Sequence, residues 1–187
     1  RIQENPIIQK ERKPHGRAGI IAFLNEVGHL PTKNHQLGSF KSADKIAGET
    51  MTKTILIGGE GCWGCAAATK RVVEVKGSPY AVKEGWGPEY ETVAAFGSLC
   101  LNSNLESIAK ANEICYHYGM DTISVGNVIA FSMECFEKKI IDMGDTGGLD
   151  LRWGNHEALV ETVLKIARKE GFGGTLSEGV REVGRRI

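Results

Sequence analysis

Apolar residues recur every three or four positions over most of the chain beyond Pro88, a spacing that is typical of helices with one buried face. Polar N-cap residues and glycines mark where these helices begin and end. The predicted helices span residues 89–101, 105–118 behind Asn104, 122–138 behind Asp121, 156–170 behind Asn155, and a last segment that opens at Thr175 or Ser177 and runs to Ile187. Segment 122–138 is apolar on nearly all sides, so we expect it to lie at the centre of the fold.

The first part of the chain carries shorter and more mixed patterns. Residues 1–15 are charged and contain two prolines, which indicates an arm without regular periodicity. An apolar stripe over residues 20–27 predicts a short buried helix, and a second helix with a serine cap is expected over residues 42–53. Residues 72–76 give the clearest β-strand pattern, and their partner in a hairpin is expected near residues 80–83.

These elements predict a mainly α fold, a single multihelical domain over residues 1–187 with a small β-hairpin near a pair of cysteines. Acidic and basic residues balance at 23 each, so no net field favours nucleic acid or an anionic membrane surface. No stretch approaches the roughly 20 apolar residues that cross a bilayer. The 5 cysteines are irregularly spaced and do not fit a secreted disulfide framework. We therefore expect a soluble cytoplasmic protein.

Chemistry is expected first at Cys62 and Cys65, which are separated by two residues in a glycine-rich bend. Such a pair directs two sulfurs into one small volume, which suits a metal ion, an iron-sulfur cluster or a reversible disulfide; two unliganded thiols are the simplest alternative. A zinc site is disfavoured because the sequence has no second C-x-x-C and no H-x₃-H pair to complete four ligands. A thioredoxin-like motif is disfavoured because a strand, not a helix, is predicted after the cysteines.

Glu89 and Glu91 form the second candidate site, directly after Pro88. The helix dipole favours acidic residues in a first helical turn, which by itself would explain both. Alternatively, one of the two carboxylates is desolvated by the apolar run behind it and exchanges a proton with a substrate. The pattern of residues does not choose between these two interpretations, and it does not say which of the two carboxylates would be the desolvated one.

Six strings of residues in the chain are distinctive. They are Asn25-Glu-Val-Gly-His-Leu-Pro-Thr-Lys-Asn34, the C-x-x-C bend, Gly87-Pro-Glu-Tyr-Glu-Thr92, Ala111-Asn-Glu-Ile-Cys115, Tyr118-Gly-Met-Asp-Thr-Ile-Ser124 and Gly147-Gly-Leu-Asp-Leu-Arg-Trp-Gly-Asn155. In this order, over nearly the whole chain, they resemble the aldehyde:ferredoxin oxidoreductase family of tungsten-pterin enzymes. The resemblance implies that the chain is the helical middle domain of a three-domain enzyme.

Members of this family oxidise an aldehyde to a carboxylic acid at a tungsten-bis-pterin centre and pass the two electrons through a [4Fe-4S] cluster to ferredoxin. The resemblance therefore implies an oxidoreductase with an aldehyde substrate, with ferredoxin as partner and with the remaining domains of the same protein as neighbours. It allows a homodimer. The balanced charge and the lack of a long apolar run predict no nucleic-acid and no membrane partner. Because the other domains complete the site, we expect the chain to be inactive by itself.

Carried over residue by residue, the resemblance implies that Cys62 and Cys65 are two metal ligands of the cluster. The third position of the family's C-x-x-C-x-x-x-C pattern is Thr69 in this chain. Thiolates hold such clusters, and a threonine hydroxyl is a poor replacement. Glu91 matches the family's glutamate beside the metal, which is the proposed proton-transfer group.

Asp121 is the cofactor-binding residue that the resemblance implies. It ends a string, Tyr116-x-x-Gly119-Met120-Asp121, that matches the family's pterin-binding D-x-x-G-L-D pattern apart from Tyr116 in place of the first aspartate. The two departures, Thr69 and Tyr116, favour an alternative from another class. In that alternative the chain is a degenerate helical scaffold or interaction domain without a cluster.

Overall fold

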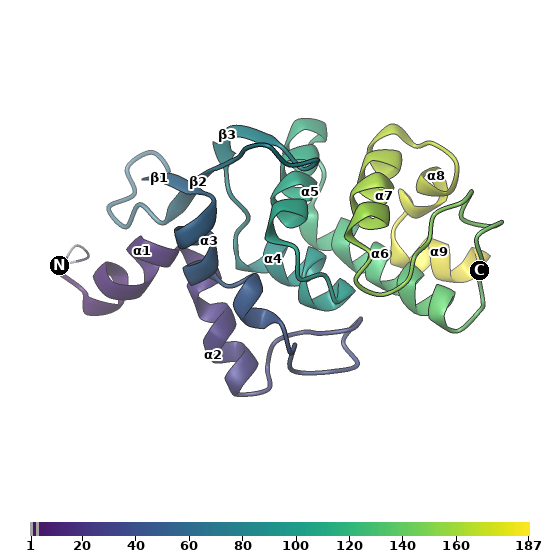
Figure 1. Cartoon of the computed structure of the whole chain (residues 1–187), viewed down its shortest axis with the longest axis horizontal. Coiled ribbons are helices and arrows are strands. Elements are labelled where there is room, and N and C mark those ends of the chain that lie inside the picture. Colours follow the sequence, from purple (N-terminus) through teal and green to yellow (C-terminus); the bar gives the residue numbers. More distant parts are fainter. Residues whose placement is uncertain (1, 3) are drawn as a thin grey trace.

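The computed structural model describes residues 2 and 4–187 and shows an elongated body with the two ends of the chain on opposite sides (Figure 1). Short helices and a small sheet form the N-terminal part, and longer helices form the rest. The fold is mainly α, as the sequence predicted. None of the described helices is both long enough and apolar enough to cross a membrane.

Short helical elements precede the sheet. They are a π-helical turn (Ile8–Arg12), α1 (Lys13–His15), a 3₁₀ turn (Arg17–Ile20), α2 (Ile21–Glu26), a second 3₁₀ turn (Ala43–Lys45) and α3 (Gly48–Thr54). The arm expected to lack periodicity is thus helical from Ile8 onward, and α2 and α3 are shorter than predicted. Gly48, the first residue of α3, packs on the turn after α1, where a Cβ would lie 2.5 Å from the backbone nitrogen of Gly19.

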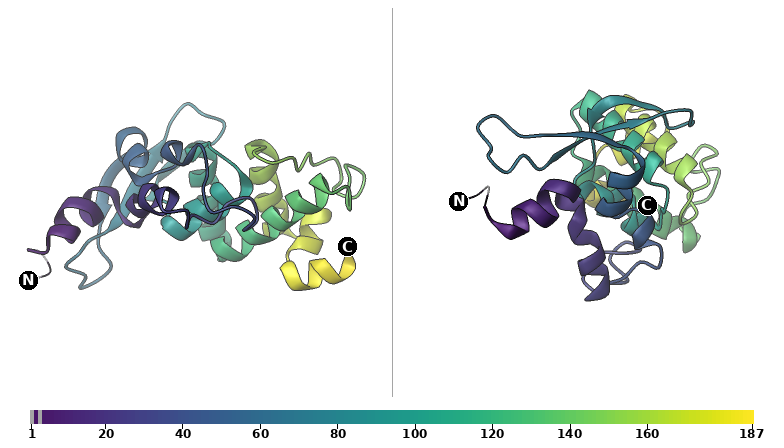
Figure 2. Two further views of the ribbon diagram at one scale, coloured as in Figure 1. Left: turned by 90° about the horizontal axis from the view of Figure 1, so that it is seen from below. Right: turned by 60° about the vertical axis from the view of Figure 1, so that its left-hand side comes forward.

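The sheet has three antiparallel strands in the order β1 (Leu56–Glu60), β2 (Lys70–Val75) and β3 (Val82–Trp86). The predicted hairpin is present as β2 and β3, with a second strand that begins two residues later than expected. The sequence did not predict β1, because its two glycines give only a weak β-strand pattern. Its pairing with β2 makes this segment a strand. The loop that joins β1 to β2 carries the two cysteines and extends away from the helices (Figure 2).

The remaining helices form the larger part of the core. They are α4 (Tyr90–Phe96), a 3₁₀ turn (Ser98–Cys100), α5 (Leu105–Tyr118), α6 (Thr122–Glu137), α7 (His156–Arg168), α8 (Phe172–Leu176) and α9 (Val180–Arg186). α6 packs against α4, α7 and α9, and its Ile129, Ala130 and Met133 are fully buried, so its predicted central position is confirmed.

The three predicted N-caps of these helices are confirmed. Asn104, Asp121 and Asn155 each accept a hydrogen bond from the backbone N–H three residues later, at 2.9, 2.7 and 3.2 Å. Each bond satisfies a backbone donor that the helix leaves without an internal partner. The N-termini of these three helices therefore lie where the sequence predicted them.

Two predicted helices are shorter in the structure than the sequence indicated. The helix expected over residues 89–101 ends at Phe96, because the backbone leaves the helical region at Gly97, with φ −97° and ψ −93°. The hydroxyl of Ser98 then donates a 2.6 Å hydrogen bond to the distant Pro31 carbonyl. The last predicted helix begins only at Val180, as α9, because Gly179 before it has a φ of +81°, outside the helical region. The short helix α8 was not predicted and begins before the expected start at Thr175 or Ser177. Both corrections reflect contacts or backbone angles that the apolar spacing does not encode.

Candidate active site

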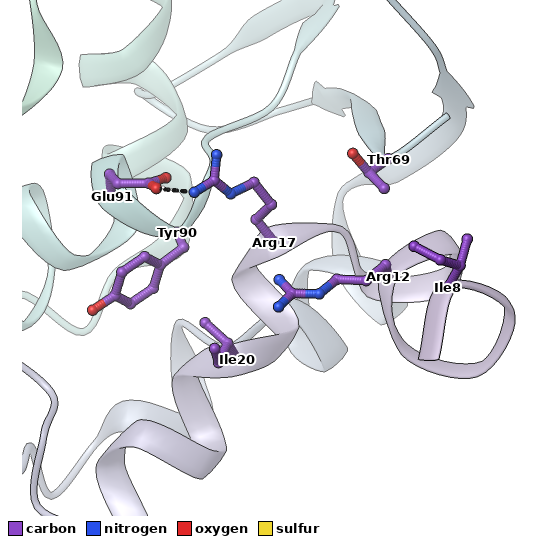
Figure 3. A pocket seen from close by; sticks show the side chains of 7 residues that line it. All are labelled: Ile8, Arg12, Arg17, Ile20, Thr69, Tyr90 and Glu91. Carbon is purple, nitrogen blue, oxygen red and sulfur yellow. Dashed lines mark hydrogen bonds and ion pairs between the residues drawn. The ribbon is translucent and has the colours of Figure 1, made fainter. Parts of the chain in front are cut away.

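Glu91 lies at the edge of a cavity of about 420 Å³ between the N-terminal arm and α4 (Figure 3). The cavity is lined by Ile8, Arg12, Arg17, Ile20, Thr69, Tyr90 and Glu91. The N-terminal arm, which in the structure extends to Ile20, contributes four of these residues, the end of the cysteine loop contributes one, and the first turn of α4 contributes two. The cavity thus combines two guanidinium groups and one carboxylate with apolar walls.

Close contact between α4 and α6 holds Glu91 in position. Gly126 of α6 lies directly against Ala95 of α4, where a Cβ on the glycine would be 2.5 Å from the Ala95 Cβ. The hydroxyl of Thr92, next to Glu91, shares a 2.8 Å hydrogen bond with the hydroxyl of Thr122 at the start of α6. These contacts fix α4 to the core and so hold Glu91 in place at the edge of the cavity.

Arg17 reaches the cavity because the arm turns sharply at Gly16. This glycine has a φ of +63°, and a Cβ on it would lie 3.0 Å from Cγ of Arg71 and 3.1 Å from the carbonyl oxygen of Thr69. Arg71 itself is 6% exposed and donates a 2.9 Å hydrogen bond from Nη1 to the Pro14 carbonyl. A buried arginine of β2 therefore fastens the arm beside the sheet.

An ion pair joins Nη2 of Arg17 to Oε1 of Glu91. The side chains are 55% and 31% exposed, so a ligand could approach the pair from solvent. Arg12 points into the same cavity (Figure 3), and no ion pair or hydrogen bond of its guanidinium is found among the described residues. The cavity therefore holds one more positive than negative group.

Glu89 differs from Glu91 in its surroundings. Its Oε2 is buried and has no hydrogen-bond partner within the described part of the chain. Burial raises the pKa of Glu89, Arg17 opposes this rise, and Glu91 adds to it. Of the two carboxylates between which the sequence did not choose, Glu89 is thus the desolvated one and Glu91 is the one that lines the cavity.

Cys62 and Cys65 lie at the two ends of a tight turn. The backbone N–H of Cys65 donates a 2.9 Å hydrogen bond to the Cys62 carbonyl, and Gly64 has the positive φ, +72°, that the third position of a type II turn requires. Both thiols are free and exposed. Hydrogen bonds from the backbone N–H groups of Ala68 and Ala67 lower the pKa of the Cys65 thiol, which favours the thiolate that binds metal.

These two cysteines fit two of the four thiolates of a [4Fe-4S] cluster, and the rest of the described chain does not complete the set. Thr69 lines the Glu91 cavity and offers only a hydroxyl. Cys100, Cys115 and Cys135 are buried in the helical body, where burial raises the pKa of Cys115 to about 12. Nowhere in residues 2 and 4–187 do three or more histidine, cysteine, aspartate or glutamate side chains converge as metal ligands do.

Asp121 is an N-cap in the structure, and the hydrogen bonds from Ser124 hold the pKa of its carboxyl below the ordinary value. Gly119, with a φ of +67°, ends the preceding helix α5. Tyr116 lies on α5 with its ring at 6.1 Å from that of Trp86. The string from Tyr116 to Asp121 therefore stops one helix and starts the next, and Asp121 borders a separate cavity of about 330 Å³.

The structure thus brings Glu91 and Thr69 into one cavity, leaves the two cysteines on the projecting loop and places Asp121 at another cavity. The sequence analysis missed Arg12 and Arg17. No local pattern identifies them, because Arg17 and its partner Glu91 are 74 positions apart. The only hint is the glycine before Arg17, which permits the turn that aims the arginine at α4.

Comparison with known proteins places the chain in a family. Residues 1–187 match the family model described as aldehyde ferredoxin oxidoreductase, domains 2 & 3. Tungsten-containing aldehyde ferredoxin oxidoreductases of Pyrococcus horikoshii and Pyrococcus abyssi are each 36% identical over 182 residues, which is 96% of this chain and 29% of each relative. A protein of Pyrococcus furiosus named aliphatic sulfonate oxidoreductase, WOR-like subunit, is 27% identical over 125 residues, which is 67% of this chain and 20% of that relative.

A solved structure shares the fold. The active-site complex BamBC of benzoyl coenzyme A reductase, determined with 1,5-dienoyl-CoA, superposes with a TM-score of 0.67 at 19% identity, over 90% of this chain and 25% of that chain. At this identity the likeness shows the fold alone. The chain spans about 29% of the length of the curated relatives that it matches most fully. On the match of its whole length, the chain belongs to the aldehyde ferredoxin oxidoreductase family.

Proposed function

We propose that this chain is the middle domain of a tungsten-dependent oxidoreductase that converts an aldehyde to a carboxylic acid, and that it supplies Glu91 to the active site. One observation supports this most directly: Glu91 faces an open cavity from a helix fixed to the core, in a chain of this family. Because the chain spans only part of its relatives, the remaining domains would complete the site. The isolated chain should accordingly have no activity.

Oxidation of an aldehyde adds the oxygen of water to the carbonyl carbon and releases two electrons and two protons. A tungsten-pterin centre, when bound, would supply the electron acceptor at this carbon. The chain's own contribution is to take up protons at the carboxylate of Glu91. The contact with Arg17 orients this carboxylate by holding one of its oxygens.

We further propose that Cys62 and Cys65 supply two thiolates to a [4Fe-4S] cluster that serves ferredoxin as electron acceptor. The type II turn and the lowered pKa of Cys65 support this role. The other ligands would come from outside the chain, since Thr69 supplies no sulfur. Asp121 would contact the pterin while it keeps its capping hydrogen bond from the backbone N–H of Ser124. A cytoplasmic location and a homodimer remain expectations from the sequence and the family.

The test of the main proposal is Glu91→Gln in the full-length protein produced with tungstate. The matched control is Glu84→Gln, which removes an exposed carboxylate from β3. Loss of a positioned proton acceptor should lower kcat about 10²- to 10⁴-fold, while bound tungsten, measured by mass spectrometry, stays the same. Full activity of Glu91→Gln at unchanged tungsten content would refute the assignment.

A second candidate, a scaffold domain without a cluster, is favoured by Thr69 at the third ligand position and by Tyr116 on the surface of α5. Analysis of iron and sulfide in the anaerobically reconstituted full-length protein separates the two functions. The cluster proposal requires bound iron that is lost in Cys62→Ser, and Thr69→Cys should raise the iron content. Absence of iron in the unmodified protein would favour the scaffold.

A further inference from the structure

The cavity beside Glu91 has a composition that neither the proton-transfer role nor the cysteine loop uses. Arg12 and Arg17 approach it from the arm, and Ile8, Ile20 and the ring of Tyr90 form apolar walls (Figure 3). Only one acidic side chain, Glu91, is among the residues that line it. A ligand that matches these walls has a small apolar body and a negatively charged head.

The charges around the cavity strengthen this match. Glu91 compensates Arg17, whereas no acidic side chain of the described chain pairs with Arg12. Lys70 lies over the Trp86 ring and Arg71 binds the Pro14 carbonyl, so the cations that line the cavity are Arg12 and Arg17. A guanidinium presents two parallel N–H donors that fit both oxygens of a carboxylate, and such pairs are stronger than hydrogen bonds between neutral groups.

We propose that this cavity is a carboxylate-binding subsite, in which Arg12 and Arg17 hold the acid group of a small organic anion and the apolar walls hold its body. The volume of about 420 Å³ suits a molecule the size of a single substituted ring. Arg17 then exchanges one carboxylate partner, Glu91, for another. Binding of the anion thereby releases Glu91 from its ion pair.

The inference deepens the proposed function and rests on it for its place in the reaction. The carboxylate could have two sources. It could be the product, whose acid group forms at the reacting carbon beside Glu91. It could also be a second acid group that an aldehyde substrate carries away from its reacting carbon. In both cases the two arginines determine which molecules bind.

Binding itself can be measured without turnover. Benzoate is titrated into the full-length protein by isothermal calorimetry at low ionic strength, with benzamide as a neutral molecule of the same shape. We expect saturable binding of benzoate, at least about tenfold weaker binding of benzamide, and a loss of affinity as salt is added. Equal affinities for benzoate and benzamide, or no saturable binding of benzoate, would overturn the proposal.

Variants assign the binding to the two arginines. Arg12→Gln and Arg17→Gln should each weaken benzoate at least about tenfold. Arg181→Gln is the matched control, because it removes an exposed arginine of α9, far from the cavity, and it should leave the affinity unchanged. All three side chains are partly or fully exposed, so circular dichroism melting should be alike. Equal benzoate affinity in Arg12→Gln and Arg181→Gln would contradict the subsite.

Kinetics of the tungsten-loaded protein then distinguish the two sources. If the product binds, Arg12→Gln raises the inhibition constant of benzoate during benzaldehyde oxidation and leaves KM for benzaldehyde unchanged. If a second acid group binds, Arg12→Gln raises KM for 4-formylbenzoate and not for benzaldehyde. If calorimetry shows the arginine-dependent site but neither kinetic constant changes, the subsite stands and the proposed catalytic place of the Glu91 cavity fails.

Discussion

Gly126 of α6 packs directly against α4, the helix that carries Glu91. A Cβ at position 126 would lie 2.5 Å from the Cβ of Ala95 and 2.8 Å from its carbonyl carbon and oxygen. Non-bonded carbon atoms normally approach to about 3.5–4.0 Å. Gly126→Ala therefore requires α4 and α6 to separate by roughly 1 Å, and the backbone atoms of Ala95 cannot move aside as a flexible side chain could.

Two opposing effects set the size of the change in stability. An alanine in a helix interior is favoured over glycine by about 1 kcal/mol. Overpacking of a well-packed core costs typically about 1–3 kcal/mol, and the backbone contacts at Ala95 place this site at the upper end. The net prediction is a loss of about 2 kcal/mol in the free energy of unfolding. For a chain of 187 residues this lowers Tm by about 4–8 °C.

The assay is thermal and urea unfolding of the purified protein, followed by circular dichroism. Gly184→Ala in α9 is the matched control, because its Cβ would meet only Cζ of Phe131 at an ordinary 3.6 Å. This control should raise the stability by up to about 1 kcal/mol. If Gly126→Ala raises Tm as the control does, the close α4–α6 contact is not the structural basis of the Glu91 position.

Two further predictions concern the titratable residues Asp121 and Glu89. Asp121→Ala should lower the free energy of unfolding by about 1 kcal/mol because α6 loses its cap, whereas Asp121→Asn should retain most of it; equal urea midpoints for the two variants would contradict the capping role. Burial raises the pKa of Glu89 above its ordinary value of 4.5, so the folded protein holds this proton to a higher pH than the unfolded chain does. The contribution of Glu89 to the free energy of unfolding is therefore greatest below pH 4.5 and is lost as the pH rises through the raised pKa. In urea titrations, the free energy of unfolding of Glu89→Gln should therefore fall less between pH 4.5 and neutral pH than that of the unmodified protein. If the two proteins show the same dependence of this free energy on pH, Glu89 is not desolvated.

The sequence by itself determined the parts of this protein whose cause is local. Asn104, Asp121 and Asn155 begin helices because a side chain that caps N–H groups three residues away needs no distant partner. The apolar residues on nearly all sides of segment 122–138 likewise predicted a central helix. The six distinctive strings of residues pointed to the family, because such strings can be recognised in the sequence without knowledge of the fold.

Only the tertiary structure decided how the candidate site is composed. Glu89 and Glu91 look equivalent in the sequence, and their difference arises from what packs around each of them. Arg17 meets Glu91 across 74 positions, after a turn at Gly16 that depends on contacts with β2. Strand β1 exists because β2 pairs with it. In each case the energy comes from groups that are distant in the sequence, and such contacts leave no periodic pattern in the chain.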